Sequence, residues 1–394
     1  MKSIDQASLA GRRVLMRVDF NVPQNENLEV TDDRRIREAA PSIRYILEQG
    51  GSVVLMSHLG RPKGGPEEKF SLKYAIPALK LHVDAEVLFA HDCIGEQAYA
   101  MSAALKPGQI LLLENVRFYK EEEKGDRDFA SKLAKHGDIY ANDAFGTAHR
   151  AHASTTIAAE FFEEKYAGFL LYKEIANADK VLNSSERPVV AIMGGAKVSD
   201  KILIIKRLLD KVDSLIIGGG MAYTFLRAKG YEVGKSLVEE DKIATAADLI
   251  KTARKKNVQI LTPVDSVVSD RFGEDGEIRI VPNESFPKDM MGLDIGPKTF
   301  EFYFDTIMDA RIILWNGPMG VFEMESFAKG TMAVAQAVVK ATENGAFSLI
   351  GGGDSAAAIA QAGLEDKVSY VSTGGGALLE YLEGKVLPGI AALG

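Results

Sequence analysis

Basic side chains follow the short apolar runs in the first half of the chain. Four such runs end where polar residues begin, at 13–18, 52–56, 110–113 and 138–141. If these runs are parallel strands, their carboxyl ends meet at the edge of the sheet where ligands bind. Guanidinium groups bind carboxylates and phosphates through paired hydrogen bonds, so several of them together favour a small ligand with more than one negative charge. The basic residues at this predicted edge are Arg35, His58, Arg61, Arg117, His149 and Arg150.

Glycine takes the same place in the second half of the chain. The apolar runs there, at 189–193, 214–217, 312–315, 347–350 and 368–372, lead into glycine-rich segments. Glycine lets the backbone approach a ligand closely, and the N-terminus of a following helix favours an anion. Together with Lys197, Lys201 and Asp354, these segments favour a bound polyphosphate. Asp354 could then meet Mg²⁺, which takes one or two carboxylates besides phosphate oxygens.

Each of these features has a simpler explanation when it is taken alone. A single arginine can form a surface ion pair, and a single glycine turn can be a tight connection. Gly351, Gly353 and Ala356 match a dinucleotide-binding pattern and leave a nicotinamide-dependent dehydrogenase open, although no acidic residue ends the next strand to bind a ribose. A non-catalytic two-lobe solute binder would explain the arginines but not the glycine-lined half. Residues 230–236 are one residue too short for a P-loop.

The apolar runs alternate with helical patterns, and this alternation predicts an α/β fold with parallel sheets. Ile36, Ala40, Ile43 and Leu47 share one face of a predicted helix. A second helical face is predicted from Val198, Ile202, Ile205, Leu209 and Val212. Residues 166–183 look helical and are followed by a polar, proline-containing break, which places the seam between two domains near 165–188.

Composition restricts the function classes. The 394 residues carry a net charge of -8 and a pI of about 5.5, so the chain lacks the basic surface that sequence-independent nucleic-acid binding needs. Cys93 is the single cysteine and cannot form an internal disulfide, which favours a reducing compartment. No signal-type N-terminus and no apolar run of membrane-spanning length is present. We therefore expect a cytoplasmic protein that binds no membrane and no nucleic acid.

Eleven segments, in order, resemble the phosphoglycerate kinase family and cover nearly the whole chain. They are RVDFNVP (17–23), TDDRRI (31–36), SHLGRPKG (57–64), LLLENVRF (111–118), NDAFGTAHRAHAST (142–155), GGAKVSDKI (194–202), LIIGGGMAYTF (215–225), LDIGPKT (293–299), WNGPMGVFE (315–323), GGGDSAAA (351–358) and STGGGA (372–377). Several of these segments are long and unusual, so chance agreement is excluded in practice.

The resemblance implies a role for each matching residue. It implies that 3-phosphoglycerate is bound by Asp19, Phe20, Asn21, Arg35, His58, Leu59, Gly60, Arg61, Arg117 and Arg150. It implies that the nucleotide is bound by Lys197, Lys201, Gly292, Glu323, Gly352, Gly353, Asp354 and Ser355, with Asp354 also at the Mg²⁺ ion. The groups implied to stabilise the transferring phosphoryl group are those of Arg35, Lys197, Gly374 and Gly375.

The family fold implies two Rossmann-like lobes, each a mainly parallel sheet flanked by helices, with a hinge and cleft between them. On this basis we predict an N-terminal lobe over 1–170, a linker helix and hinge over 171–188, and a nucleotide-binding lobe over 189–376. The tail at 377–394 is expected to return to the first lobe. The implied reaction is ATP plus 3-phosphoglycerate giving ADP plus 1,3-bisphosphoglycerate, reversibly, with a monomer as the family expectation.

Overall fold

Two six-stranded parallel sheets form the framework of the computed structural model, which describes residues 1–394. Contacts divide the chain into two units. Unit 1 comprises Met1–Ala176 and Val386–Gly394, and unit 2 comprises Asn177–Lys385. The prediction of an α/β fold with parallel sheets is confirmed.

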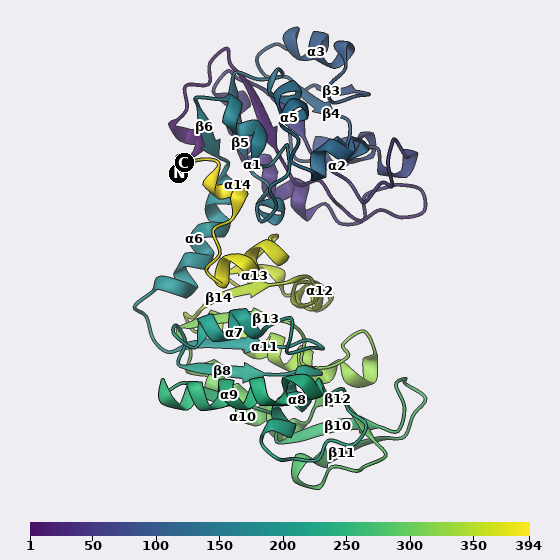
Figure 1. Ribbon diagram of the computed structural model, residues 1–394, viewed down its shortest axis with the longest axis vertical. Coiled ribbons are helices and arrows are strands. Elements are labelled where there is room, and N and C mark those ends of the chain that lie inside the picture. Colours follow the sequence, from purple (N-terminus) through teal and green to yellow (C-terminus); the bar gives the residue numbers. More distant parts are fainter. The chain divides into compact units, whose positions relative to one another are not determined.

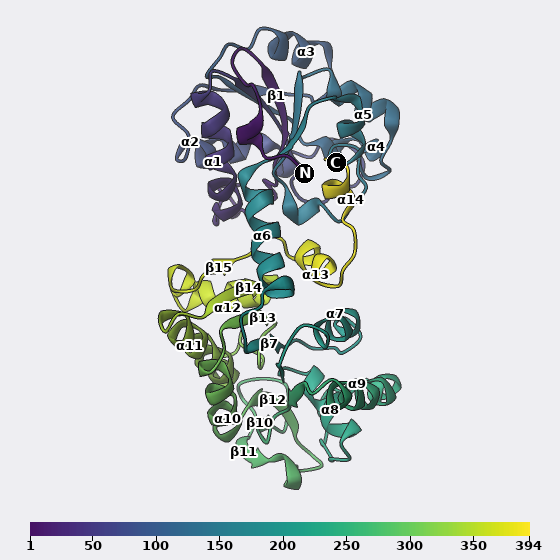
Figure 2. The same ribbon diagram turned by 90° about the vertical axis from the view of Figure 1, so that its left-hand side faces the viewer.

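The sheet of unit 1 has the strand order β3-β4-β2-β1-β5-β6. Helices cover both of its faces, with α1 and α2 on one side and α4 and α5 on the other (Figure 2). The strands are β1 (Arg13–Arg17), β2 (Ser52–Met56), β3 (Val87–Ala90), β4 (Ile110–Leu113), β5 (Ile139–Asn142) and β6 (Lys165–Ala167). The helices are α1 (Arg34–Glu48), α2 (Ile76–Lys80), α3 (Glu96–Ala103), α4 (Lys120–Glu123), α5 (Arg127–Ala134) and the C-terminal α14 (Pro388–Ala391).

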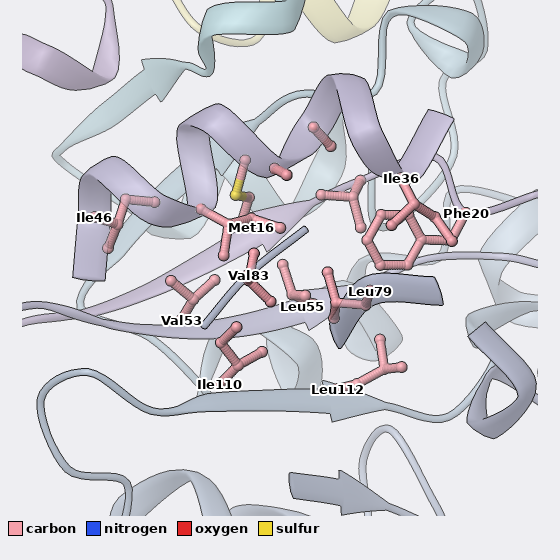
Figure 3. Close-up of a cluster of buried hydrophobic side chains, with 14 of the residues drawn as sticks. Met16, Phe20, Ile36, Ile46, Val53, Leu55, Leu79, Val83, Ile110 and Leu112 are labelled. Atoms are coloured by element: carbon pink, nitrogen blue, oxygen red, sulfur yellow. The ribbon is translucent and has the colours of Figure 1, made fainter. Parts of the chain in front are cut away.

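The core of unit 1 explains why its sequence forms these elements. The strands β2 and β4 are buried along their whole length, as expected for a parallel sheet that is covered on both faces. Figure 3 shows Ile36 and Ile46 of α1 packed over Met16 and the neighbouring β2 side chains. The 3.6-residue period of the apolar positions in α1 therefore matches the face that it buries.

The sheet of unit 2 has the order β15-β14-β13-β7-β8-β9. Figure 2 shows α7, α8 and α9 on one of its faces and α10, α11 and α12 on the other. The strands are β7 (Val189–Met193), β8 (Ser214–Ile217), β9 (Gln259–Leu261), β13 (Ile312–Asn316), β14 (Phe347–Gly351) and β15 (Tyr370–Val371). The helices are α7 (Ile202–Leu208), α8 (Met221–Ala228), α9 (Ile243–Lys255), α10 (Pro297–Met308), α11 (Lys329–Glu343), α12 (Gly353–Gln361) and α13 (Gly376–Leu382).

Unit 2 also contains an antiparallel sheet that the sequence analysis did not predict. Its strands are β10 (Asp265–Ser269), β11 (Ile278–Pro282) and β12 (Met291–Ile295), in the order β11-β10-β12. In β11 only Val281 is buried, so this strand lacks the continuous apolar run that marks the strands of the parallel sheet.

The boundaries differ from the predicted ones in three places. The helix predicted from Val198 to Val212 is shorter, because α7 covers only Ile202–Leu208 and a loop precedes it. Residues 165–167 form β6, and α6 (Phe169–Asn183) follows them. Residues 377–385 group with unit 2, so only Val386–Gly394 pack in unit 1.

The two chain ends both belong to unit 1 and lie side by side (Figure 1). The C-terminal segment is held there by backbone contacts, since the Gly389 N–H donates to the Ala148 carbonyl at 2.8 Å. None of the helices in the structure is both long enough and apolar enough to span a bilayer.

Candidate active site

The carboxyl ends of four adjacent strands carry the basic residues of unit 1. Strand register pairs Arg17, the last residue of β1, with Met56 of β2 and with Asn142 of β5. The neighbouring strand β4 is in register with β2 through Leu112 and Leu55. The loops that follow these strands therefore leave the sheet at one edge, as the sequence pattern predicted.

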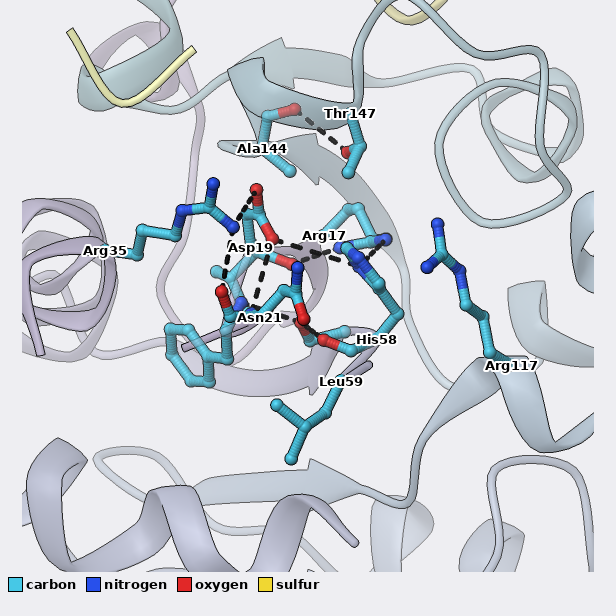
Figure 4. Close-up of polar contacts among 12 residues, drawn as sticks. Arg17, Asp19, Asn21, Arg35, His58, Leu59, Arg117, Ala144 and Thr147 are labelled. Atoms are coloured by element: carbon cyan, nitrogen blue, oxygen red, sulfur yellow. Dashed lines mark hydrogen bonds and ion pairs between the residues drawn. The ribbon is translucent and has the colours of Figure 1, made fainter. Parts of the chain in front are cut away.

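Asp19 organises the loop after β1. Its carboxylate lies 3.2 Å from the Arg35 guanidinium, which also donates to the Asn21 carbonyl at 2.8 Å (Figure 4). The Asn21 side-chain oxygen accepts the Gly60 N–H at 2.8 Å and so ties this loop to the one after β2. The Phe20 N–H donates to the Ser57 hydroxyl at 2.8 Å. The structure thus brings together five of the predicted residues, four on two adjacent loops and Arg35 in the first turn of α1.

Arg17 is the side chain that the sequence analysis missed. It is only 1% exposed, and its Nη2 lies 3.2 Å from His58 Nδ1. Its Nε donates to the Ser154 hydroxyl at 2.8 Å, and that hydroxyl donates to the buried Glu122 carboxylate at 2.6 Å. Because a guanidinium can only donate, His58 Nδ1 must be the acceptor, and the ring proton is on Nε2.

His58 is kept neutral by its surroundings. Burial is the main cause that lowers the pKa of His58 well below its ordinary value. The charges of Arg17, Arg117, Arg35 and Arg150 lower it further. Because each of these guanidinium groups acts on His58, all four lie within electrostatic reach of one imidazole. The cluster is therefore strongly positive without a charged histidine.

Arg117 approaches the cluster from the side opposite to Arg35 (Figure 4). Its Nη1 donates to the Gly60 carbonyl at 2.9 Å, whereas its Nη2 is buried without a hydrogen-bond partner. The Leu59 carbonyl accepts a hydrogen bond from the Asn115 side chain at 2.7 Å, which fixes the same loop. Arg117 thus has a donor left for a ligand.

Gly60 is needed for steric reasons. Its φ is +64°, and a Cβ there would lie 2.3 Å from the Phe70 ring. Arg150 is half-buried, and its Nε lies 3.2 Å from His149 Nε2. Arg61, by contrast, is exposed and is not among the groups that lower the pKa of His58. The structure therefore gathers three of the four predicted arginines, with Arg17 added, and leaves Arg61 at the surface.

Unit 2 contains a cavity of about 510 Å³ at its glycine-rich loops. Of the predicted nucleotide residues, Gly292, Glu323 and Asp354 line it. The rest of the lining is mainly glycine and apolar side chains, including Leu237 and Met319. An apolar cavity with a few polar groups at its edge is typical of a site for an organic cofactor or nucleotide.

Glycine backbone is closely approached by neighbouring atoms around this cavity. Gly219 has a φ of +68°, and a Cβ on it would lie 2.6 Å from the backbone nitrogen of Gly195. A Cβ on Gly292 would lie 1.9 Å from the Tyr223 hydroxyl. Both positions therefore require glycine, so the shape of the cavity depends on them.

Lys201 and the loop after β14 meet through Asn316. The Lys201 ammonium donates to the Asn316 side-chain oxygen, and the Asn316 amide donates to the Gly351 carbonyl at 2.8 Å. Burial lowers the pKa of Lys201, while Asp354 and Asp200 oppose that shift. The lysine, Asp354 and the Gly351 loop therefore form one local group.

Gly352, Gly353, Asp354 and Ser355 lie at the N-terminal end of α12. Gly352 precedes the helix with a φ of +88°, and Asp354 is exposed in its first turn. The Ser355 hydroxyl is buried and accepts the Gly317 N–H at 2.5 Å, so it joins the loops after β13 and β14. At α13, the Gly374 N–H donates to the Ser372 hydroxyl at 2.9 Å, and Gly375 precedes the helix with a φ of +51°.

Lys197 lies exposed in the loop between β7 and α7. Two residues later, Ser199 donates both its N–H and its hydroxyl to the Glu239 carboxylate, at 3.0 and 2.5 Å. Sequence analysis gave no signal for Glu239, which lies in an ordinary acidic run. The loop that carries Lys197 is therefore fixed beside this residue.

The residues present fit a magnesium ion that is bound mainly by phosphate. The structure has no group of three or more acidic, histidine or cysteine side chains that could hold a metal by themselves. Asp354 is a single exposed carboxylate at the edge of the cavity. Mg²⁺ commonly takes one or two carboxylates and fills its other positions with phosphate oxygens and water.

A family model described as phosphoglycerate kinase matches residues 4–385. The chain belongs to the phosphoglycerate kinase family. The phosphoglycerate kinase of Chloroherpeton thalassium is 54% identical over 392 residues, which cover 100% of this chain and 98% of that protein. That of Chlorobaculum tepidum is 53% identical and covers 100% and 99%.

Solved structures agree with this assignment. Phosphoglycerate kinase from Coxiella burnetii matches with a TM-score of 0.89 and 42% identity, covering 99% of this chain and 98% of that one. The enzyme from Pyrococcus horikoshii matches with a TM-score of 0.80 and 32% identity, covering 100% and 98%. The chain is thus an enzyme of the kinase class, which confirms the resemblance, and the dehydrogenase and solute-binder alternatives are wrong.

The reaction of phosphoglycerate kinases is a step of glycolysis. A phosphoryl group moves reversibly between ATP and the carboxylate of 3-phosphoglycerate, giving ADP and 1,3-bisphosphoglycerate in one direction. A small acid with two anionic groups suits an arginine cluster, and a nucleotide suits a glycine-lined cavity.

Proposed function

We propose that this enzyme binds 3-phosphoglycerate at the arginine cluster of unit 1 and ATP or ADP in the cavity of unit 2. The observation that carries the proposal is the separation of chemistry between the two units. In unit 1, Arg17 contacts the neutral His58 and three further guanidinium groups lie within electrostatic reach of it, whereas glycine loops, lysines and one exposed carboxylate border the cavity in unit 2.

In unit 1 the acid would bind through charge-assisted hydrogen bonds. Arg35, Arg117 and Arg150 supply guanidinium donors, and Arg61 adds an exposed one at the surface. Asp19 forms an ion pair with the Arg35 guanidinium, and the Asn21 carbonyl accepts a hydrogen bond from it, so both residues hold Arg35 in place. Neutral His58 can donate from Nε2 without adding charge. Phe20, Leu59 and Gly60 contribute the shape and backbone of the pocket.

In unit 2 the nucleoside would occupy the 510 Å³ cavity, where Gly292 and Glu323 line the wall. Lys201 and the start of α12, at Gly352, Gly353 and Ser355, would face the phosphates. Asp354 would hold Mg²⁺, which, when bound with the nucleotide, neutralises part of the phosphate charge. An exposed cation such as Lys197 can follow the phosphoryl group as it moves.

The chemistry needs no general base, because the nucleophile is a carboxylate. Carboxyl groups of small acids titrate near pH ~4 and are ionised at neutral pH. The residues therefore contribute positioning and charge stabilisation of the transferring group. We assign this stabilisation to Arg35, Lys197 and the backbone amides of Gly374 and Gly375.

The proposal also covers a hinge motion, the oligomeric state and the cellular location of the enzyme. Sites on separate units must come into contact for the transfer, and a hinge near residues 171–188, within and after α6, would allow this. We further propose a cytoplasmic monomer that binds neither membrane nor nucleic acid. Most of the relatives are bacterial, while one from Volvox carteri, 52% identical, is chloroplastic.

A coupled assay tests the proposed function directly. ATP turnover is measured with 3-phosphoglycerate, with glycerate as the control that lacks the phosphate group, and with Mg²⁺ present or chelated. We expect turnover with 3-phosphoglycerate and Mg²⁺ only. Equal turnover with glycerate would show that the arginine cluster does not select the phosphorylated acid.

A further inference from the structure

Glu239 is held between the loop that carries Lys197 and the helix α8. Its carboxylate accepts the N–H of Ser199 at 3.0 Å and the Ser199 hydroxyl at 2.5 Å. Its own N–H donates to the hydroxyl of Thr224, a buried residue of α8, at 3.1 Å. The backbone of Glu239 is therefore anchored to α8, and its carboxylate holds the loop through the two hydrogen bonds from Ser199.

The loop between β7 and α7 has few other attachments. At its start the Gly195 carbonyl accepts the Met221 N–H at 3.0 Å, and at its end Lys201 bonds to Asn316. Between these ends Val198 is buried, while Lys197 and Ser199 are exposed. The Glu239 carboxylate, which accepts from Ser199 and is also approached by the Val198 amide, is thus the side-chain attachment nearest to Lys197.

An acidic side chain near a polyphosphate site weakens the binding of the phosphates by charge repulsion. Its presence there is therefore explained only if it has another role. Burial acts to raise the pKa of Glu239, but the Ser199 hydroxyl and the amides of Ser199 and Val198 outweigh it, so this pKa is lowered. The group is therefore ionised at neutral pH and keeps its two hydrogen bonds there. The same segment also provides Leu237, which lines the nucleotide cavity.

We infer that Glu239 is a positioning residue, which fixes the loop beside Lys197 so that the ammonium is aligned for phosphoryl transfer. The inference rests on the role proposed above for Lys197. Because Leu237 and Glu239 belong to one short segment, a nucleoside in the cavity would press on the segment that aligns the lysine. Glu239 itself touches neither substrate, and its effect passes through the backbone of residues 197–199.

A double-mutant cycle tests this inference. We expect Glu239→Ala to lower kcat by on the order of tenfold, a coupling typical of groups that act through one another. The KM for 3-phosphoglycerate should stay unchanged, because unit 1 is untouched. In a Lys197→Ala background the same substitution should have almost no further effect. Glu239→Gln, whose amide oxygen can still accept one hydrogen bond, should recover part of the loss.

Glu240→Ala is the matched control, since Glu240 is the adjacent exposed acid and its side chain makes no hydrogen bond or ion pair in the structure. It should leave kcat unchanged, and the thermal midpoints of all variants should agree. Additive effects of Glu239→Ala and Lys197→Ala would overturn the inference, as would a wild-type kcat in Glu239→Ala. A wild-type kcat in Lys197→Ala alone would overturn the role proposed for Lys197, and with it this inference.

Discussion

The two units place opposite kinds of groups at the carboxyl ends of similar sheets. In unit 1 the groups at these ends are side chains that hold one another, from Glu122 through Ser154 and Arg17 to His58. In unit 2 the corresponding positions are glycines, and the charged groups Lys197 and Asp354 are exposed. One unit offers a preformed basic cluster, and the other offers backbone and a cavity.

This difference corresponds to the demands of two ligands. A small acid offers few atoms, so each contact must be strong and well placed, which buried charge-assisted hydrogen bonds provide. A nucleotide offers a large apolar surface and a phosphate chain that backbone amides can follow. The same parallel-sheet edge can serve both because function lies in the loops and not in the strands.

Lys197→Ala should give the largest effect. The exposed ammonium is free to follow the phosphoryl group, so we expect its contact to strengthen in the transition state and not in the ground state. Loss of one such contact costs roughly 10²- to 10³-fold in kcat. Steady-state kinetics should show this loss with both KM values little changed. A change in KM alone would make Lys197 a ground-state ligand and leave Arg35 as the main stabilising group.

Arg117→Ala should weaken binding of the acid and leave ATP affinity nearly intact. The residue is buried and keeps a donor without a partner, so its loss should cost about 1.5–3 kcal/mol of binding. Arg61→Ala is the comparison within the same unit and should cost less, because its side chain is exposed. Isothermal titration calorimetry with each ligand separates these cases. If ATP affinity fell as much as acid affinity, the assignment of ligands to units would be wrong.

Sequence alone predicted most of the strands and the placement of the site loops. The runs 52–56, 110–113, 189–193 and 214–217 coincide with β2, β4, β7 and β8, because buried parallel strands are continuously apolar. The strands β10, β11 and β12 were missed because no continuous apolar run marks them: β11 is mostly exposed, and β10 and β12, although mostly buried, are interrupted by Asp, Ser or Gly.

The site was predicted less completely than the sheet. Arg17 was visible as a charged residue within the apolar run 13–18, but only the structure shows that it is buried against His58. Glu122 and Glu239 had no sequence signal, because their partners, Ser154 and Ser199, lie far along the chain. Exposure likewise separates Arg61 from the other arginines, and local sequence does not encode it.

The buried carboxyl of Asp143 in unit 1 predicts how the stability of the protein depends on pH. Its Oδ1 accepts the Leu171 N–H at 2.9 Å, while Oδ2 is buried without a partner. Burial raises the pKa of Asp143 to about 7, although hydrogen bonds from Ser42, Leu171 and Leu170 oppose it. The folded protein thus prefers the protonated form. The contribution of Asp143 to the free energy of unfolding is fully present below the ordinary carboxyl pKa. It is lost as the pH rises towards 7.

Asp143→Asn should remove that pH dependence, since the amide imitates the protonated acid. Within the window from about pH 4 to 7, one such proton changes the free energy of unfolding by about 1.4 kcal/mol per pH unit. Urea unfolding followed by circular dichroism measures the slope, with Asp84→Asn, an exposed position, as the control. An identical slope in wild type and Asp143→Asn would show that Asp143 is ionised throughout.

Asp354→Asn tests the exposed charge in unit 2. It removes a negative charge at the proposed Mg²⁺ position and nearly keeps the shape. We expect the Mg²⁺ concentration needed for half-maximal turnover to rise by about tenfold. If Asp354 only stabilised the first turn of α12, in which it lies after the N-cap Gly352, the substitution would remove a favourable charge near the helix N-terminus and leave the Mg²⁺ dependence unchanged. An unchanged Mg²⁺ titration would therefore favour this purely structural role.

The smallest expected signal concerns the overall size of the molecule. The acid and the nucleotide bind to different units in our proposal, and transfer requires the reacting atoms to be roughly 3–3.5 Å apart. Water must also be excluded, because ATP and the acyl phosphate would otherwise hydrolyse. Ordering the units and desolvating charge costs free energy, so neither ligand alone should favour the closed state strongly. We predict a smaller radius of gyration by small-angle scattering with both ligands than with either one. Equal radii in the empty, singly bound and ternary states would mean that no hinge motion accompanies catalysis, so the two sites would have to face each other before any ligand binds.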